Sequence, residues 1–460
     1  MERAVVLIDG EHYIPVTRSA IETIRERGDY EVVGAVFIGG TEKIGTRGDV
    51  AALGLPVIMN KDPVAGIEEG ISRFQPDIMI DLSDEPVVGY VERFRFANVI
   101  LNREVAYAGA DFRFDPPYLM DIMEKPSISV MGTGKRTGKT AACAYVARLL
   151  SGQEDGESLY DPCIVTMGRG GPPEPELVPG KELNMTPDYL LSLADRGKHA
   201  ASDHFEDALM TRLTTIGSRR CGGGFAGVVY TSNVDRSAML ANTLPENLVL
   251  FEGSGACSLS IKVDAQILIV GAHQPLEYIG GYMGPYRVMR SDLIIITLCE
   301  PPMADEEKVR EMDACIRAIN PEAKVVHTIF RPKPLQDISG KKVLLTVTAP
   351  PKMGPVLARS LEDNYGCRVV CTSHNLANRP KLRADIAECL GKGGGIEALL
   401  TEVKAAGIDV AARLGKENGL QVVFMDNILV TVGGDGHLPS LIKDLARKAE
   451  ERFAARKGGD

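Results

Sequence analysis

The sequence has no excess of basic residues. Its 52 Lys and Arg are outnumbered by 62 Asp and Glu, which gives a formal net charge of −10 at pH 7. A broad nucleic-acid-binding surface needs clustered Lys and Arg that displace counterions from phosphates. We therefore expect no nucleic-acid partner, and any polyanionic ligand is expected to bind in a local basic pocket.

Long apolar runs are also missing. No uninterrupted apolar stretch approaches the roughly 18 residues of a membrane helix, and the N-terminal MERAVVLIDGEHY has neither a long apolar segment nor a cleavage site. These features predict a soluble, cytoplasmic protein with no membrane partner. The nine cysteines stand singly, and the closest pair, Cys367 and Cys371, lacks the context of a zinc ribbon or a redox Cys-x-x-Cys. We expect free thiols.

The N-terminal part alternates short apolar runs with amphipathic segments but has no GxGxxG after its first apolar run. The alternation predicts parallel βαβ units, and the missing glycines argue against dinucleotide binding. Ligands of such sheets bind at the carboxyl ends of strands, where Asp9, Glu11, His12 and Thr41 are found. Asp9, Glu11 and His12 are candidate substrate-binding residues. The alternative role for all four is turn and helix-cap chemistry, which favours the same residue types.

The stretch MGTGKRTGKTAA at 131–142 has the ending of a phosphate-binding loop. In such loops glycines let backbone N–H groups turn toward phosphates at the start of a helix. An apolar run precedes this stretch, and a segment with helical composition follows it. The pattern assigns Lys139 to the β and γ phosphates of a nucleotide and Thr140 to Mg²⁺. The other cofactor-binding candidates are Gly132, Gly134, Gly138 and Thr133, which replaces the usual first glycine.

A nucleotide loop of this kind also needs a carboxylate at the end of a neighbouring strand to support the metal. Glu252 in LVLFEGSGA supplies one, and the alternative is that it caps a following helix. An acidic residue followed by Gly-x-Gly at this point resembles the motif of kinases and ATP-dependent ligases related to dethiobiotin synthetase. The guanine-reading sequence N-K-x-D is missing from this segment, so we expect ATP and Mg²⁺.

The loop carries more positive charge than ATP requires. Lys135 and Arg136 lie inside it, and Arg169 follows the next apolar run, a position that faces the γ-phosphate in P-loop folds. Arg219 and Arg220 are further candidates for substrate binding, although they would also suit the solvated end of a helix. Guanidinium groups match phosphate oxygens, so the extra charge predicts a second, strongly anionic substrate. The candidate catalytic residues are Lys135, Arg136, Lys139, Arg169 and Glu252.

These patterns predict an α/β protein, and its length of 460 residues indicates three domains. We expect a Rossmann-like N-terminal parallel sheet at 1–124 that closes over the substrate and a central P-loop nucleoside triphosphatase domain at 125–338. A smaller α/β domain at 339–460 would complete the chain. The size of this last domain and its amphipathic final helix suggest a homodimer contact.

The chain resembles the cyclic 2,3-diphosphoglycerate synthetase family over its full length. The resemblance rests on LIDGEHY, GTGKRTGKTA, GRGGPPEPELV and LFEGSGA. It implies an enzyme that uses ATP to close a phosphoanhydride within 2,3-diphosphoglycerate, giving the cyclic compound, ADP and phosphate. In methanogens such a product is a compatible solute and phosphate store. The residues themselves indicate ATP, Mg²⁺ and a polyanionic acceptor, whereas the acceptor's identity comes from the resemblance alone.

Two other functions remain open on the sequence. A P-loop kinase would phosphorylate a phosphorylated small molecule such as 2-phosphoglycerate. An ATP-driven switch or metallochaperone would couple hydrolysis to a change in a protein interface, although metal-ligand spacing is missing. No Cys–His or Ser–His–Asp pattern suggests a covalent protein intermediate, so catalysis is expected to rely on positioning and charge neutralisation.

Overall fold

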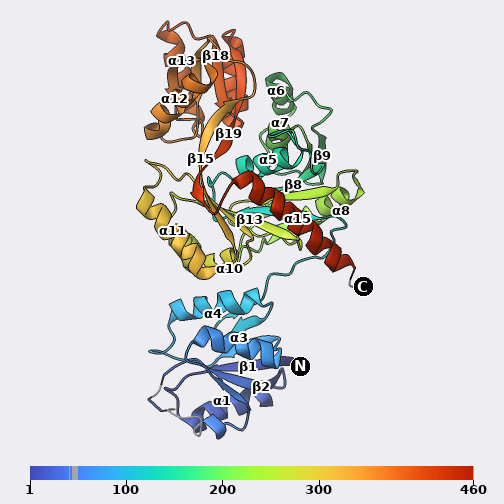
Figure 1. Cartoon of the computed structure of the whole chain (residues 1–460), viewed down its shortest axis with the longest axis vertical. Coiled ribbons are helices and arrows are strands. Elements are labelled where there is room, and N and C mark those ends of the chain that lie inside the picture. Colours follow the sequence, from blue (N-terminus) through green and yellow to red (C-terminus); the bar gives the residue numbers. More distant parts are fainter. Residues whose placement is uncertain (41, 44–49, 459–460) are drawn as a thin grey trace. The chain divides into compact units, whose positions relative to one another are not determined.

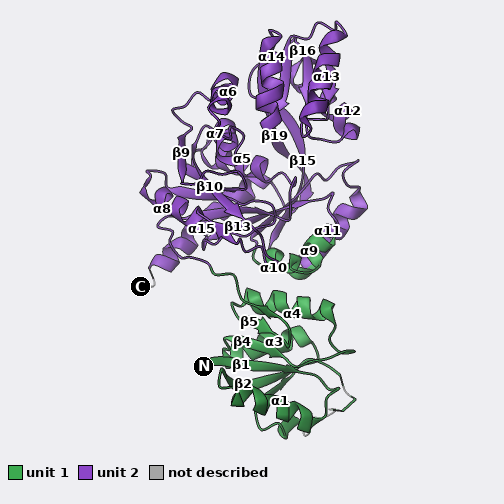
Figure 2. Ribbon diagram, turned by 180° about the vertical axis from the view of Figure 1, so that it is seen from behind, with its two compact units in different colours: residues 1–118, 276–290, 318–320 green, residues 119–275, 291–317, 321–460 purple. Residues whose placement is uncertain are grey.

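The structure is a computed structural model that describes residues 1–40, 42–43 and 50–458. The predicted α/β class with parallel sheets is confirmed. Across these residues, no helix has the length and apolar character that crossing a membrane requires. The chain forms two compact units, shown in Figure 2: residues 1–118, 276–290 and 318–320, and residues 119–275, 291–317 and 321–460.

The first unit holds a mainly parallel sheet with the strand order β3-β2-β1-β4-β5-β6. Its strands are β1 (Glu2–Ile8), β2 (Tyr30–Phe37), β3 (Val57–Met59), β4 (Ile78–Asp81), β5 (Ala106–Ala108) and β6 (Arg113–Phe114). Its helices include α1 (Ile14–Glu26), α3 (Pro63–Phe74), α4 (Tyr90–Asn102), α9 (Glu277–Gly280) and α10 (Gly284–Met289). The central strand β1 is buried from Ala4 to Ile8, as is typical of a parallel strand covered on both faces.

The second unit is built on one long sheet with the order β11-β10-β8-β12-β7-β13-β14-β15-β19-β18-β16-β17, and β9 pairs with β10. The strands of its P-loop part are β7 (Ser127–Gly132), β8 (Pro162–Gly168), β9 (Glu176–Pro179), β10 (Thr214–Cys221), β11 (Thr231–Ser232), β12 (Leu248–Glu252), β13 (Ala265–Gly271), β14 (Leu293–Thr297) and β15 (Lys324–Pro334). Those of its C-terminal part are β16 (Lys342–Thr346), β17 (Arg368–Ser373), β18 (Ala398–Glu402) and β19 (Gln421–Gly434).

Helices connect these strands. Those of the P-loop part are α5 (Lys139–Leu150), α6 (Pro187–Asp195), α7 (Asp203–Thr211), α8 (Val234–Thr243) and α11 (Glu306–Ile319). Those of the C-terminal part are a 3₁₀ turn (Pro351–Met353), α12 (Gly354–Tyr365), α13 (Arg379–Gly391), a π-helix (Gly407–Ala412), α14 (Arg413–Glu417) and α15 (Leu438–Lys457).

Two long strands make the C-terminal part continuous with the P-loop sheet. β15 pairs antiparallel with β19 from Val326↔Gly434 to Pro334↔Met425, and β19 pairs parallel with β18. Figure 1 shows both strands running from the P-loop part into the C-terminal part. One sheet therefore carries both parts.

The final helix, α15, packs against its own chain. Its apolar residues Leu438, Ile442 and Leu445 are buried in one core with Ile128 and Val130 of β7. This helix suggested a homodimer contact in the sequence, but its apolar face is already occupied. The units differ from the three predicted domains because β19 and α15 return to the P-loop sheet. The three-domain division and the homodimer stay predictions.

Shortening a side chain in this core should destabilise the second unit. Ile442 is fully buried, and removing such a side chain typically costs about 2–5 kcal/mol. We expect Ile442→Ala to lower the free energy of unfolding by about 2–4 kcal/mol, measured by urea denaturation. Glu451→Ala, on the exposed side of the same helix, should change it by less than about 0.5 kcal/mol. Equal values for the two variants would mean that α15 is only loosely docked.

Apolar content misplaces one strand of the P-loop part. The apolar residues of GVVYTSNVD at 227–235 predict a strand, but the run contains only the short β11, and Val228 and Tyr230 before it are exposed. The strand beside β8 is instead β10, whose sequence TTIGSRRC has few apolar residues. Apolar content alone therefore does not identify the strand that carries Arg219 and Arg220.

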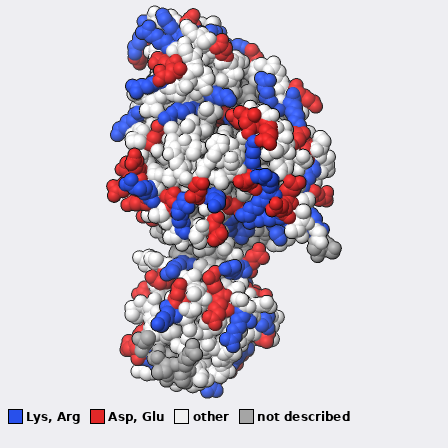
Figure 3. All heavy atoms as spheres, in the orientation of Figure 1, with Lys and Arg blue, Asp and Glu red and all other residues white. Residues whose placement is uncertain are grey.

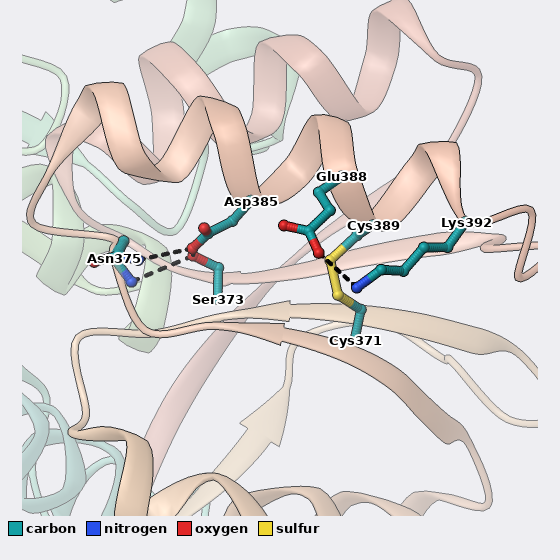
Figure 4. The surroundings of a disulfide bond; sticks show 7 residues. All are labelled: Cys371, Ser373, Asn375, Asp385, Glu388, Cys389 and Lys392. Carbon is teal, nitrogen blue, oxygen red and sulfur yellow. Dashed lines mark hydrogen bonds and ion pairs between the residues drawn. A yellow bond between two sulfur atoms is a disulfide. The ribbon is translucent and has the colours of Figure 1, made fainter.

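The prediction of free thiols is wrong for one pair. Cys371 of β17 and Cys389 of α13 form a disulfide with Cα atoms 6.1 Å apart (Figure 4). The two cysteines are 18 residues apart in the chain, and the connection that returns α13 along β17 brings them together. Beside them, Ser373 and Asn375 donate hydrogen bonds to Asp385 at 2.5 and 2.8 Å. Seven other cysteines are free thiols, as predicted.

Candidate active site

The phosphate-binding loop lies between β7 and α5, and the predicted order of strand, loop and helix is confirmed. β7 is buried throughout, and α5 begins at Lys139 directly after Gly138. Gly138 has a φ of 84°, and a Cβ there would lie 2.1 Å from Cζ of Phe330 on β15. A glycine is required at this position for both its backbone angle and its packing.

Lys139 is folded into the loop. Its Nζ donates a hydrogen bond to the carbonyl oxygen of Gly134 at 2.7 Å, and the residue is 8% exposed. Its side chain passes over Gly132, where a Cβ would lie 2.6 Å from Cδ of Lys139. Burial lowers the pKa of Lys139, and the charges of Glu252 and Asp203 oppose this shift. The ammonium group is thus held by a neutral carbonyl, in the place where a phosphate would be a stronger partner.

Thr133, the residue in place of the usual first glycine, anchors the loop. Its backbone N–H donates to the carbonyl of Ile269 at 3.0 Å, and its hydroxyl hydrogen-bonds the side-chain oxygen of Gln274. The same Gln274 oxygen accepts a hydrogen bond from the backbone N–H of Gly271 at 3.3 Å. The threonine therefore fastens the first turn of the loop to the segment that follows β13.

Glu252 ends β12 and faces the loop. Its Oε1 accepts a hydrogen bond from the Thr140 hydroxyl at 2.6 Å, and the residue is only 2% exposed. Burial, followed by the charge of Asp203, raises the pKa of Glu252 to about 8. In the described chain no helix separates β12 from β13, so Glu252 is not a helix cap.

A Mg²⁺ ion fits the pair Thr140 and Glu252. Within the described residues, Oε2 of Glu252 is buried and has no hydrogen-bond partner. The same part of the chain contains no group of three or more His, Cys, Asp or Glu side chains arranged to hold a metal. Mg²⁺ at nucleotide sites is held by few protein groups together with phosphate oxygens and water, and this donor set matches that pattern.

Three carboxylates next to Glu252 were missed by the sequence analysis. Asp203, Glu206 and Asp207 occupy positions i, i+3 and i+4 of α7, so they share one face of the helix. A Cβ on Gly168, the last residue of β8, would lie 2.9 Å from Oδ2 of Asp203. Burial, followed by the charge of Glu252, raises the pKa of Asp207. The sequence does contain a signal for these three residues: acids at helical spacing in a segment that also has apolar residues for a buried face.

Arg169 and Arg220 approach the glycine-rich turn after Glu252. Gly255 has a φ of 63°, and a Cβ there would lie 2.8 Å from Nη2 of Arg169. Nη2 of Arg220 donates to the backbone oxygen and hydroxyl of Ser254 at 3.0 and 3.2 Å. Arg219 and Arg220 lie on β10, so the helix-end alternative is wrong, and strand alternation leaves Arg219 exposed and Arg220 buried. Only Arg220 of this pair reaches the turn after Glu252.

Lys135 and Arg136 are the exposed cations of the loop. Arg136 has a φ of 64°, a left-handed conformation that is unfavourable for a residue with a Cβ. Burial, followed by the charges of Lys308 and Arg136, lowers the pKa of His273, which follows β13. Strained backbone at a ligand loop is typical of functional sites, and here it directs a cation to the outside of the loop.

Three family models together match most of the chain. Residues 3–115 match the N-terminal domain of cyclic 2,3-diphosphoglycerate synthetase, residues 127–329 its P-loop domain, and residues 334–428 its C-terminal domain. The chain belongs to the cyclic 2,3-diphosphoglycerate synthetase family. The three matches confirm the resemblance that the sequence motifs indicated.

Full-length relatives of this synthetase family come from archaea and bacteria. The chain is 46% identical to the cyclic 2,3-diphosphoglycerate synthetase of Methanothermobacter thermautotrophicus, over 99% of this chain and 98% of that protein. It is 45% identical to that of Methanothermus fervidus over 98% of each. It is also 45% identical to that of Rubrobacter xylanophilus, over 97% of this chain and 98% of that protein. The similarity therefore includes all three parts matched by the family models.

In this member of the synthetase family, the N-terminal candidates form their own cluster in the first unit. Oδ1 of Asp9 accepts hydrogen bonds from the backbone N–H groups of Glu11 and His12 at 3.0 and 3.2 Å, and lies 2.8 Å from Nδ1 of His12. Oδ2 of Asp9 accepts from the backbone N–H of Asp84 at 2.6 Å. Asp9 thus organises the turns after β1 and β4, and Thr41 lies outside the described residues.

Proposed function

We propose that this chain is an ATP-dependent ligase that converts 2,3-diphosphoglycerate into its cyclic phosphoanhydride and releases ADP and phosphate. Full-length similarity to cyclic 2,3-diphosphoglycerate synthetases supports this reaction. The exposed pair Lys135 and Arg136 in the ATP-type loop is the observation that supports a polyanionic acceptor. Acidic and basic side chains are interspersed over the face shown in Figure 3. An anion therefore needs a local group of cations, such as Lys135 and Arg136.

The reaction needs two successive displacements at phosphorus. An oxygen of one acceptor phosphate attacks the γ-phosphorus of ATP, and the bond to ADP breaks. An oxygen of the other acceptor phosphate then attacks the first acceptor phosphorus and displaces the transferred group as inorganic phosphate. This closes the P–O–P bond within the molecule and requires no protein nucleophile, only positioning and charge neutralisation.

The residues of the second unit divide these tasks. Lys139 would bind the β and γ phosphates, and Thr140 with Glu252 would hold Mg²⁺, which would neutralise charge on the phosphate oxygens. Arg169 neutralises charge between donor and acceptor, together with Lys135 and Arg136. Asp9, Glu11 and His12 stay the candidate substrate-binding residues of the first unit.

Phosphorus NMR of the products tests the function. Incubation with ATP, Mg²⁺ and 2,3-diphosphoglycerate should give a cyclic phosphoanhydride and free phosphate in equal amounts. An acyclic phosphate ester from 2-phosphoglycerate, without free phosphate, would establish the kinase alternative. ATP turnover that is equally fast without any small polyanion would establish the switch.

Replacing Arg136 should weaken use of the acceptor more than use of ATP. We expect Arg136→Ala to raise the KM for 2,3-diphosphoglycerate about 10- to 100-fold, as for loss of one charge-assisted contact, while the KM for ATP changes less than about threefold. Steady-state kinetics with each substrate varied provides the measurement.

Arg212→Ala is the matched control. Arg212 is also an exposed arginine with left-handed backbone, at a φ of 54°, and it follows the last turn of α7, about 13 Å along the helix from Asp203. It should leave both KM values unchanged. Unchanged acceptor kinetics in Arg136→Ala would show that the extra charge of the loop has another role.

We also propose that the enzyme is a cytoplasmic homodimer. ATP and a phosphorylated acceptor as substrates support the location. Since the apolar face of α15 lies within its own core, the dimer contact would use another surface. Light scattering on the purified protein gives the oligomeric state, and a monomer at micromolar concentration would contradict the proposal.

A further inference from the structure

A small pocket of about 40 Å³ opens beside the first turn of α5. Thr140 lines it from the P-loop part, Glu206 from α7, and Glu402 and Lys404 from the end of β18 and the residues that follow. The C-terminal part of the chain therefore contributes side chains next to the residues that would hold ATP and its metal.

Lys404 is the cation of this pocket. Its Nζ lies 2.7 and 2.9 Å from the two carboxylate oxygens of Glu206. The Lys404 side chain is 45% exposed, whereas that of Glu206 is 11% exposed. Burial would lower the pKa of Lys404, but the charge and hydrogen bonds of Glu206 outweigh it and raise that pKa, so the ammonium group stays protonated. Because the partly exposed Lys404 side chain lines the pocket, a ligand there can approach its ammonium group.

Glu402 is a second carboxylate that lines this pocket. It accepts hydrogen bonds from the backbone and hydroxyl of Thr348 at 3.2 and 2.7 Å. Burial raises the pKa of Glu402, while the hydrogen bond from Thr348 and the charges of Lys404 and Arg136 oppose that shift. Lys404 and Arg136, from distant parts of the chain, thus act on the same carboxylate.

The ion pair of Lys404 is one of several contacts that hold the C-terminal part against α6 and α7. Arg413 of α14 pairs with Asp195 of α6 at 2.5 Å, and Lys416 of the same helix pairs with Asp188. Val403, Ile408 and Phe424 are also buried in one apolar cluster with residues of α6 and α7. The Arg413 and Lys416 ion pairs join the same two parts at positions outside the pocket.

We propose that Lys404 binds an anionic group of the acceptor, beside the first turn of α5, so that the C-terminal part completes the acceptor subsite. This inference rests on the proposed function. Without a ligand, the carboxylate of Glu206 pairs with Lys404. A phosphate carries up to two negative charges and three strong acceptor oxygens, so it competes with a single carboxylate for the ammonium group of Lys404.

Variants at both ends of the ion pair separate binding from structure. Lys404→Met should raise the KM for 2,3-diphosphoglycerate about 10- to 100-fold, with less than about a threefold change in the KM for ATP, and Lys404→Arg should restore most of the loss. Glu206→Gln removes the competing charge, so 2,3-diphosphoglycerate should bind to it as tightly as to the wild type or more tightly, in calorimetry without ATP. Arg413→Met is the matched control, and it should leave acceptor binding unchanged.

The results that overturn the inference are distinct. If Lys404→Met and Glu206→Gln both lower the melting temperature and leave acceptor affinity unchanged, the ion pair is structural. If Glu206→Gln weakens acceptor binding as much as Lys404→Met does, the carboxylate and not the cation is required. Should Lys404→Met fail to fold, Lys404→Gln and the Glu206→Gln titration decide the question. A wild-type enzyme that binds 2,3-diphosphoglycerate through Lys404 but forms no cyclic product would contradict the proposed function alone.

Discussion

Lys139→Ala should abolish ATP-dependent formation of the cyclic product. The ammonium group is buried in the loop, 2.7 Å from the carbonyl of Gly134, and its charge is placed for the phosphates of ATP. Loss of one such group from a water-poor site costs about 100- to 1000-fold in rate. Because the substitution removes a full positive charge, we expect kcat/KM for ATP to fall by the upper end of that range. ADP release and phosphorus NMR provide the two measurements.

A lysine elsewhere on the second unit provides the control for this prediction. Lys392 pairs with Glu388 on the surface of α13 at 2.7 Å, and Lys392→Ala should keep full activity. Circular dichroism should show that both variants are folded. If Lys139→Ala kept a tenth of the wild-type rate, other cations such as Arg169 would have to hold the phosphates.

Glu252→Gln should inactivate the enzyme and at the same time stabilise the metal-free protein. Oε1 of Glu252 accepts a hydrogen bond from the Thr140 hydroxyl at 2.6 Å, and its other oxygen is unpaired within the described chain. The substitution replaces with an amide the carboxylate that we propose supports Mg²⁺. We expect the rate to fall about 100- to 1000-fold. Without metal, no cation fully compensates the buried negative charge of Glu252, and this burial costs free energy. The neutral amide of the variant removes that cost.

The stabilisation should depend on pH. The folded-state pKa of Glu252 is about 8, above the usual value of 4.5, so between these values the folded protein binds more protons than the unfolded one. The free energy of unfolding contributed by Glu252 is therefore full below pH 4.5 and is lost as the pH rises toward 8.

Urea denaturation in EDTA measures this effect. At pH 8.5, Glu252→Gln should be more stable than the wild type by about 2–4 kcal/mol, and the difference should shrink toward pH 5. Added Mg²⁺ should narrow it as well, because a ligand that binds only the folded wild type stabilises it. A variant less stable than the wild type at pH 8.5 would mean that the carboxylate is already neutralised by a neighbouring cation.

The nucleotide loop was predictable because its signal is local. Strand β7, the loop and the start of α5 are contiguous in the chain, and their order follows from apolar content and glycine spacing. Glu252 was found because such sites place an acid at the end of a neighbouring strand. The structure adds its hydrogen bond with Thr140, which joins residues 112 positions apart.

Other contacts of the site join residues that lie far apart in the sequence, so no local pattern predicts them. Lys404 and Glu206 are 198 positions apart, and each alone looks like an ordinary charged surface residue. Gln274, which holds Thr133, lies 141 positions from it. Arg220 was misjudged because its strand, β10, has few apolar residues and is recognisable only from its pairing with β8 and β9.

The return of the chain through β19 and α15 has a consequence for truncated variants. The core beneath the phosphate-binding loop includes Ile442 and Ala446 of α15, which follow the whole C-terminal part along the chain. A fragment that stops after β15 would therefore leave the apolar underside of the nucleotide sheet uncovered, and we expect ATP binding to require the residues of α15.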